Sequence, residues 1–187
     1  MKSVKSFFFT AVILVLPFSK VDAQNTFQSP SENKSVIYIM RTSALGAIMN
    51  FRFFDGEKYL GKFKDKNYLR YECKPGKHLF WVKAENTDYL EADLLVDKIY
   101  MVEANAVMGA FSAGVKFNIL DFNDDKKMKR VFKLLTKKEP MVFDENELLK
   151  DQNDMQEIIK NGLEKYENKL DRDKEFNKIT PEMFYTI

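Results

Sequence analysis

Cys73 and His78 are the only thiol and the only imidazole in the chain. They flank the segment 74–77, Lys-Pro-Gly-Lys, in which Pro and Gly suit the middle of a tight turn. If the flanking strands form a hairpin, Cys73 lies opposite His78, and a thiol beside an imidazole is the beginning of a cysteine nucleophile. A free Cys is more often a small buried hydrophobic residue, and no helix N-terminus adjoins this one to stabilise a thiolate. The sequence therefore favours structural roles, and we assign no catalytic residue.

Acidic residues cluster in two places, at Asp121, Asp124 and Asp125 and at Asp171 and Asp173. Glycosidases need two carboxylates across a cleft, and the sequence does not place any of these acids in such a pair. The first cluster lacks the loop Gly and the terminal bidentate Glu of an EF-hand calcium site. Helix capping and solvation explain these acids. The chain also lacks a Gly-rich phosphate loop and a Gly-x-Ser-x-Gly nucleophile elbow, so we expect no metal and no cofactor.

Two segments between expected strands are unusually apolar for loops. The segment 42–49 carries Leu45 and Ile48, and the segment 108–114 carries Met108 and Phe111. If both loops lie at one end of the domain, these four side chains form a candidate binding patch. The alternative is that the loops pack on each other or under the C-terminal helices.

The composition indicates one soluble globular domain with an extension. The chain has 187 residues, of which 45% are hydrophobic and 31% are charged. A single Cys rules out a disulfide framework within the monomer.

The first 23 residues have the pattern of a secretory signal peptide. Lys2 and Lys5 give a positive start, residues 7–18 are an apolar run, and residues 21–23 offer small side chains for cleavage before Gln24. The run is shorter than the roughly 20 residues of a membrane-spanning helix. An uncleaved anchor is the alternative. We expect an exported protein, periplasmic or secreted after cleavage.

Cleavage would change the net charge. The leader carries three lysines and one aspartate, a net charge of +2, and the whole chain also carries +2, so the mature chain is neutral. Nucleic-acid binding needs a basic domain, and we therefore expect no nucleic-acid partner.

Short β-branched and aromatic runs separated by turn signals follow a polar lead-in at 24–34. The expected strands cover 36–40, 50–54, 59–63, 68–73, 78–84, 90–96, 99–107 and 115–122. Asp55-Gly56 is a strong hairpin signal. Seven or eight strands at this spacing predict a mainly β domain at 35–122, a β-sandwich or a small barrel.

The turn at 74–77 allows a finer prediction, because side chains alternate along a strand. The residues expected on the core face are Leu69, Tyr71, Cys73, His78, Phe80 and Val82. Arg70 is expected opposite Trp81 on the outer face.

After Phe122 the hydrophobic period becomes helical, which predicts a C-terminal α-helical extension at 123–187. Asn123 or Asp124 can cap the first helix, and Asp144 with Glu147 can cap a long second helix that runs to about residue 175. Gly162 is a candidate bend. The long helix either packs on the sandwich, which its single apolar face favours, or docks a partner.

Seven basic residues lie within 126–138, on the first of these helices. A solvated face is the simpler interpretation. The alternative is contact with anionic lipid or with an acidic partner.

The region 36–122 resembles an uncharacterised family of small exported bacterial β-domains. The resemblance lies in the runs Phe51-x-Phe53-x-Asp55-Gly56-x-x-x-x-Gly61, Tyr68-x-x-Tyr71 and Pro75-Gly76-Lys77-His78. That family is a domain of unknown function with a PEGA-like pattern, and many of its members are lipoproteins. The resemblance implies a sandwich of unknown role at the bacterial envelope. This chain lacks a lipobox Cys, so it does not share the lipid anchor.

These observations lead us to expect a non-enzymatic binding or interaction module of the bacterial envelope, whose partner is an envelope protein or component. Two alternatives come from other classes. One is a hydrolase that uses unrecognised carboxylates or the Cys73–His78 pair. The other is a small-ligand carrier, since a β-barrel can enclose an apolar molecule.

Overall fold

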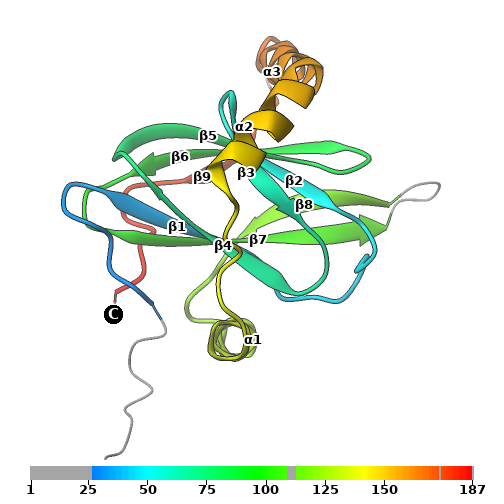
Figure 1. Ribbon diagram of the computed structural model, residues 1–187. Coiled ribbons are helices and arrows are strands. Elements are labelled where there is room, and N and C mark those ends of the chain that lie inside the picture. The colour runs from blue at the N-terminus through cyan, green and yellow to red at the C-terminus, as the bar shows by residue number, and fades with distance from the viewer. Residues whose placement is uncertain (1–26, 109–112, 173, 187) are drawn as a thin grey trace, which may run out of the picture.

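The computed structural model describes residues 27–108, 113–172 and 174–186, and its fold is mainly β with a C-terminal helical part (Figure 1). The strands are β1 Ser35–Arg41, β2 Phe51–Asp55, β3 Lys58–Phe63, β4 Asn67–Cys73, β5 Gly76–Lys83, β6 Thr87–Leu94, β7 Ile99–Met108, β8 Ala113–Ile119 and β9 Asn177–Ile179. The helices are α1 Asp125–Lys137, α2 Glu145–Asp154 and α3 Gln156–Leu170. The predicted fold class is confirmed.

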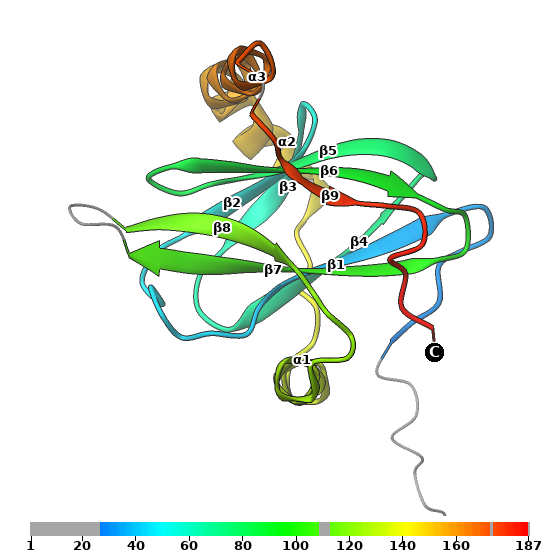
Figure 2. The same cartoon turned by 180° about the vertical axis from the view of Figure 1, so that it is seen from behind.

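The strands form two sheets that face each other (Figures 1 and 2). Sheet A has the order β4-β1-β7-β8, and sheet B has the order β3-β2-β5-β6-β9. The space between them is filled by fully or almost fully buried aromatic side chains, among them Phe51, Phe53, Phe63, Phe80 and Phe117. This core forms because alternate residues point inward from both sheets, apart from a register shift in the β2–β3 pair.

Helices cover the outer face of each sheet, which gives four layers. α1 packs on sheet A through its buried face, and α3 packs on sheet B through Ile159 and Gly162 (Figure 1). Much of the outer face of each sheet is therefore covered. This explains why all seven residues of β1 are buried, with Ile37 in the core and Tyr38 under α1.

The predicted hairpin between β4 and β5 is wrong. β4 pairs with β1 in sheet A, whereas β5 pairs with β2 and β6 in sheet B, so the chain crosses between sheets at Lys74 and Pro75. The core-face assignment is confirmed for Leu69, Tyr71, Cys73, Phe80 and Val82, because two facing sheets and a hairpin direct the same alternate residues inward. His78 is the exception, since its ring pairs with Asp55 and lines a surface hollow. The Arg70–Trp81 contact does not exist: Arg70 pairs with Glu72 at 3.2 Å on sheet A, and Trp81 lies under α3 on sheet B.

The predicted long helix is two helices. The chain breaks at Met155, which has φ −95° and ψ 2°, and α3 then runs straight through Gly162. The apolar stripe is continuous across Met155, so the hydrophobic periodicity of the sequence does not indicate the break. The predicted N-caps are confirmed, because the Asp124 and Asp144 carboxylates each accept two backbone N–H groups. α3 packs on the sandwich, as its apolar face indicates.

Connecting segments cover the sheet edges. The Met141 N–H donates to the Tyr68 carbonyl of β4, and the Phe143 ring lies directly over Gly61 of β3. On the other side, β9 pairs with β6, and the Tyr185 N–H donates to the Ile99 carbonyl. None of the described helices is both long and apolar enough to cross a membrane.

Part of the predicted lead-in also packs on the domain. The Phe27 side chain is buried, and its ring meets the Tyr38 ring edge-on at 5.4 Å. The predicted signal peptide lies outside the described residues.

Candidate functional site

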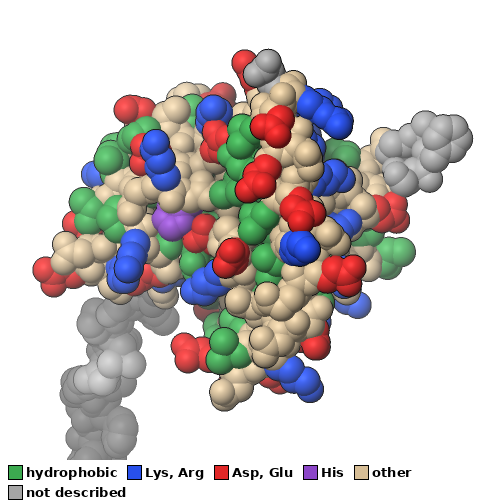
Figure 3. Space-filling view, turned by 90° about the horizontal axis from the view of Figure 1, so that it is seen from above, with side chains coloured by type: hydrophobic (Ala, Val, Ile, Leu, Met, Phe, Trp, Pro, Cys, Tyr) green, Lys and Arg blue, Asp and Glu red, His purple; other side chains and the backbone are tan. Residues whose placement is uncertain are grey.

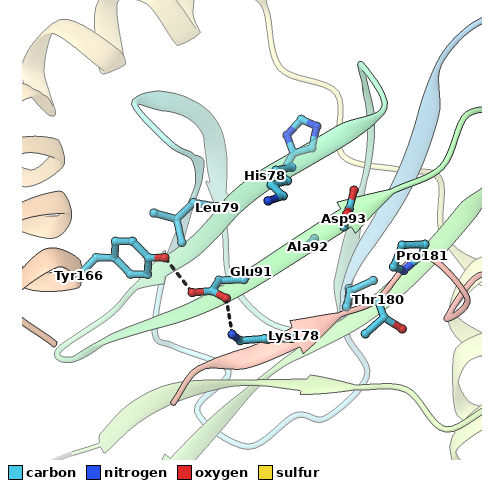
Figure 4. Close-up of a pocket in the computed structure, with 11 residues that line it drawn as sticks. His78, Leu79, Glu91, Ala92, Asp93, Tyr166, Lys178, Thr180 and Pro181 are labelled. Atoms are coloured by element: carbon cyan, nitrogen blue, oxygen red, sulfur yellow. Dashed lines mark hydrogen bonds and ion pairs between the residues drawn. The ribbon is translucent and has the colours of Figure 1, made fainter. Parts of the chain in front are cut away.

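A hollow of about 620 Å³ lies on the outer face of sheet B, between α3 and β9 (Figure 4). We call it the α3–β9 groove. Its lining includes the charged residues Lys77, Glu91, Asp93 and Lys178, the aromatic Tyr166 and the aliphatic Leu79. The strand register explains the floor: Lys77 lies opposite Asp93 and Leu79 opposite Glu91, and alternate residues of paired strands share a face.

Glu91 is the fixed point of the groove. The Tyr166 hydroxyl donates to one carboxylate oxygen at 2.8 Å, and the Lys178 ammonium lies 3.0 Å from the other (Figure 4). Burial alone would raise the pKa of Glu91, but these two partners outweigh it and the pKa is lowered. Burial, together with the Glu91 charge, raises the pKa of Tyr166 to about 12. At neutral pH the site therefore holds an ionised carboxylate that accepts from a protonated phenol.

The position of Tyr166 depends on how α3 meets the sheet. The Trp81 ring packs against Gly162, where an added Cβ would lie 2.7 Å from the indole. The Tyr89 hydroxyl donates to the Gly162 carbonyl at 2.6 Å, and the Tyr89 ring contacts the Tyr166 ring. The sequence analysis missed this arrangement, because Tyr166 is part of a regular apolar stripe. The sequence offered one indication, a glycine inside a predicted helix. Such a glycine can mark a place where the helix packs closely on a bulky side chain, here the single Trp of the chain.

A charged cluster lies near one end of the groove, where the His78 ring is visible at the surface (Figure 3). Its Nδ1 lies 2.8 Å from the Asp55 carboxylate and its Nε2 lies 2.8 Å from the Lys74 carbonyl oxygen. The Tyr71 hydroxyl donates to the same Asp55 oxygen at 3.2 Å. The cluster therefore ties the β2–β3 turn to β5 and to the crossover between the sheets.

The protonation of His78 follows from its partners. A carbonyl oxygen only accepts, so Nε2 carries a proton. Hydrogen bonding to Asp55 is the main cause that raises the pKa of His78 to about 10, against the effect of burial. The ring is an imidazolium at neutral pH and has no free nitrogen to accept a proton from Cys73. This geometry supplies no general base for a cysteine nucleophile.

The predicted apolar patch is present in part. Leu45, Ile48 and Met108 expose 50%, 91% and 68% of their surfaces. The loop with Leu45 and Ile48 lies beside the end of β7, because an added Cβ at Gly46 would be 2.8 Å from the Ala106 Cβ. Phe111 lies outside the described residues. We call this surface the apolar end.

A buried arginine shapes the apolar end. Arg41, at the end of β1, is 1% exposed and its guanidinium lies 3.7 Å from the centre of the Phe51 ring. It donates to the carbonyl oxygens of Met49 at 2.8 Å and Gly46 at 3.0 Å. The loop at 42–50 is therefore held from inside by a planar fork of donors.

We expect Arg41→Lys to loosen this loop. A lysine keeps the charge but cannot reach both carbonyl groups and stack on Phe51, so the variant should lose about 2 kcal/mol of unfolding free energy. Urea denaturation measures the loss, and amide hydrogen exchange should rise in residues 43–50. Arg52→Lys is the control, since the Arg52 Nε has no hydrogen-bond partner among the described residues. An equal loss in both variants would contradict the anchoring role.

Among the described residues, no group of three or more His, Cys, Asp and Glu side chains is arranged to hold a metal ion. No family model matches this chain, and neither a curated protein nor a solved structure matches it. The resemblance to the PEGA-like family therefore stays a prediction.

Proposed function

We propose that the protein is an exported, non-enzymatic binding module of the bacterial envelope, and that the α3–β9 groove holds its ligand. The observation that carries this proposal is the Glu91 carboxylate, fixed by Tyr166 and Lys178 inside a hollow of about 620 Å³. Ligand sites of small molecules commonly have volumes of roughly 300–1,000 Å³ and a few well-placed polar groups. The leader pattern of residues 1–23 supports export.

The charges of the groove indicate the class of ligand. Lys77 and Lys178 provide two cations, and Glu91 and Asp93 provide two anions, around the apolar side chain of Leu79. A small molecule that carries both carboxylates and amines matches this mixture. Soluble disaccharide-peptide fragments of peptidoglycan have such groups, and the expected compartment contains them.

The ionisation of the groove supports binding over acid–base chemistry. Efficient general acids and bases have a pKa near the working pH. Here the pKa of Glu91 is lowered, the pKa of Tyr166 is about 12 and the pKa of the nearby His78 is about 10. These groups hold fixed protonation states at neutral pH, which suits recognition by charge and hydrogen bonding.

The hydrolase alternative has one observation in its favour, since Glu91 and Asp93 both line the groove. A glycosidase acid needs a raised pKa, and the pKa of Glu91 moves the other way. In Figure 4 the Glu91 carboxylate points toward Tyr166 and Lys178, whereas the Asp93 carboxylate is not directed at it. The carrier alternative receives no support from the core, because side chains fill the space between the sheets.

The test is binding of purified disaccharide-peptide fragments, followed by amide chemical shifts in NMR. We expect shifts in β5, β6, β9 and α3, and about tenfold weaker binding by Glu91→Gln, because a charge-assisted contact is lost. Asp151→Asn is the matched control, since Asp151 pairs with Lys62 at 3.1 Å in a different hollow. Shifts confined to the apolar end would contradict the groove assignment, and release of cleaved fragments would contradict the non-enzymatic role.

A further inference from the structure

α1 presents a stripe of positive charge on the side that faces away from sheet A. The members of this basic stripe are Lys126, Lys129, Arg130, Lys133 and Lys137, and all five are exposed. At 3.6 residues per turn, they fall within about 100° of the helix circumference. The buried residues of α1 occupy the opposite side and pack on the sheet. The stripe is therefore a continuous outer surface of the molecule.

The fold itself does not neutralise this charge. Of the basic residues in 126–138, only Lys127 lies within ion-pair distance of a carboxylate among the described residues, at 3.6 Å from Asp124. The stripe also contains like charges four residues apart, such as Lys129 with Lys133 and Lys133 with Lys137. Such pairs destabilise a helix by a few tenths of a kcal/mol each. Apart from Lys137 in the last turn, where a cation suits the helix dipole, helix stability gives no reason for the stripe, and an external anionic partner does.

The opposite face of the molecule carries the opposite charge. α1 has six basic residues and one acidic residue, whereas α2 and α3 together have seven acidic and four basic residues. The two layers lie on opposite sides of the sandwich (Figures 1 and 2). The expected mature chain is neutral in total, so this is a separation of charge across the molecule. An anionic surface would attract the α1 side and repel the α2–α3 side.

We propose that the basic stripe of α1 docks the protein on an anionic lipid bilayer. Four of the five stripe residues are lysines, and lysine acts as a point charge, whereas the paired recognition of phosphates in a fixed geometry favours arginine. A fluid lipid surface needs only the charge. Phe132 flanks the stripe; its ring packs against Phe27, and the 36% of its surface that is exposed can contact the headgroup region.

This docking orients the candidate site. The α3–β9 groove lies on sheet B, and α1 lies on the outer face of sheet A. A molecule bound to a bilayer through α1 holds the groove toward the aqueous side. The proposal does not depend on the ligand of the groove, and the two are tested with different probes.

The experiment is sedimentation with vesicles, using the chain that begins at Gln24 and contains every described element. We expect binding to vesicles that contain phosphatidylglycerol, no binding to phosphatidylcholine alone, and a steep loss of binding with added salt. The triple variant K126Q/K133Q/K137Q should bind about 100-fold more weakly, since each removed lysine counts for about fivefold. Its thermal unfolding should be unchanged or improved, because like charges are removed.

The matched control is K150Q/K160Q/K165Q, which removes three exposed lysines from α2 and α3 and changes the net charge equally. This control should bind vesicles like the wild-type chain. Equal losses in the two triple variants would overturn the stripe as the docking element. Absence of binding to phosphatidylglycerol vesicles by the folded chain would overturn the proposal. Tighter binding to duplex DNA than to these vesicles at the same salt would replace lipid with nucleic acid as the partner.

Discussion

Asp55→Asn should lower the unfolding free energy by about 3 kcal/mol at neutral pH, because it leaves the largely buried His78 imidazolium without its counter-charge. The pair is close, at 2.8 Å, and its side chains are only 13% and 14% exposed. The same change weakens the hydrogen bond from Tyr71. Urea denaturation measures the effect. The control is Glu57→Gln, which removes an exposed carboxylate from the same turn and should change stability by less than about 0.5 kcal/mol.

The same pair makes stability depend on pH. The pKa of His78 is about 10 in the folded protein and about 6.5 in an unfolded chain. Between these values the folded state binds the additional proton, so stability falls as pH rises. The contribution is fully present below about pH 6.5 and is lost by the time the pH passes through 10. The difference in unfolding free energy between the wild-type chain and His78→Gln should shrink across this range. A difference that stays constant with pH would show that the ion pair is not its source.

The Asp55–His78 pair also shows why sequence analysis reaches only part of this molecule. The Asp55-Gly56 hairpin was predictable, because an αL turn signal and two flanking apolar runs are local. The signal at Pro75-Gly76 was equally local, yet it marks a crossing between sheets. A tight turn says that the chain changes direction, and it does not say which strand the next segment pairs with. The prediction that Cys73 lies opposite His78 rested on a β4–β5 pairing that does not exist, because the two strands belong to different sheets.

The candidate site was beyond local signals for a related reason. Glu91 and Tyr166 are 75 residues apart in the chain, and Lys178 comes from a strand of three residues. The charged residues of β6 have the ordinary pattern of a solvated sheet face. They become a site only because α3 and β9 lie on either side of them. The periodicity of the sequence does not specify where α3 and β9 pack on sheet B. The apolar end was predictable in part, because the apolar loops are local features. Their anchor, Arg41, was not, because in the sequence it is simply the last residue of an ordinary strand.

The docking of α3 depends on one absent side chain, and Gly162→Leu should therefore have a large effect. An added Cβ would lie 2.7–2.8 Å from atoms of the Trp81 ring. The indole has no room to yield, because it is fully buried and stacks on Phe54 at 3.7 Å. Overpacking of this kind costs about 1–3 kcal/mol, and here it also breaks the hydrogen bond from Tyr89 to the Gly162 carbonyl. We expect a loss of about 3 kcal/mol, measured by urea denaturation.

The neighbouring substitution Asn161→Leu is the control that distinguishes a steric clash with the sheet from the mere addition of a leucine to α3. It adds the same side chain one position earlier, where the residue is exposed, and should change stability by less than about 0.5 kcal/mol.

Gly162→Leu displaces Tyr166 with α3, and the carboxylate of Glu91 loses one of its two partners. Its groove should therefore bind peptidoglycan fragments at least as weakly as the Glu91→Gln variant, even at temperatures where the domain remains folded. Normal binding by a folded Gly162→Leu protein would show that the groove does not need α3. Loss of binding in Gly162→Leu, together with normal binding in Asn161→Leu, would show that the groove depends on the close packing of α3 at Gly162. The helical pattern of the sequence indicates that glycine only as a weak position in a helix.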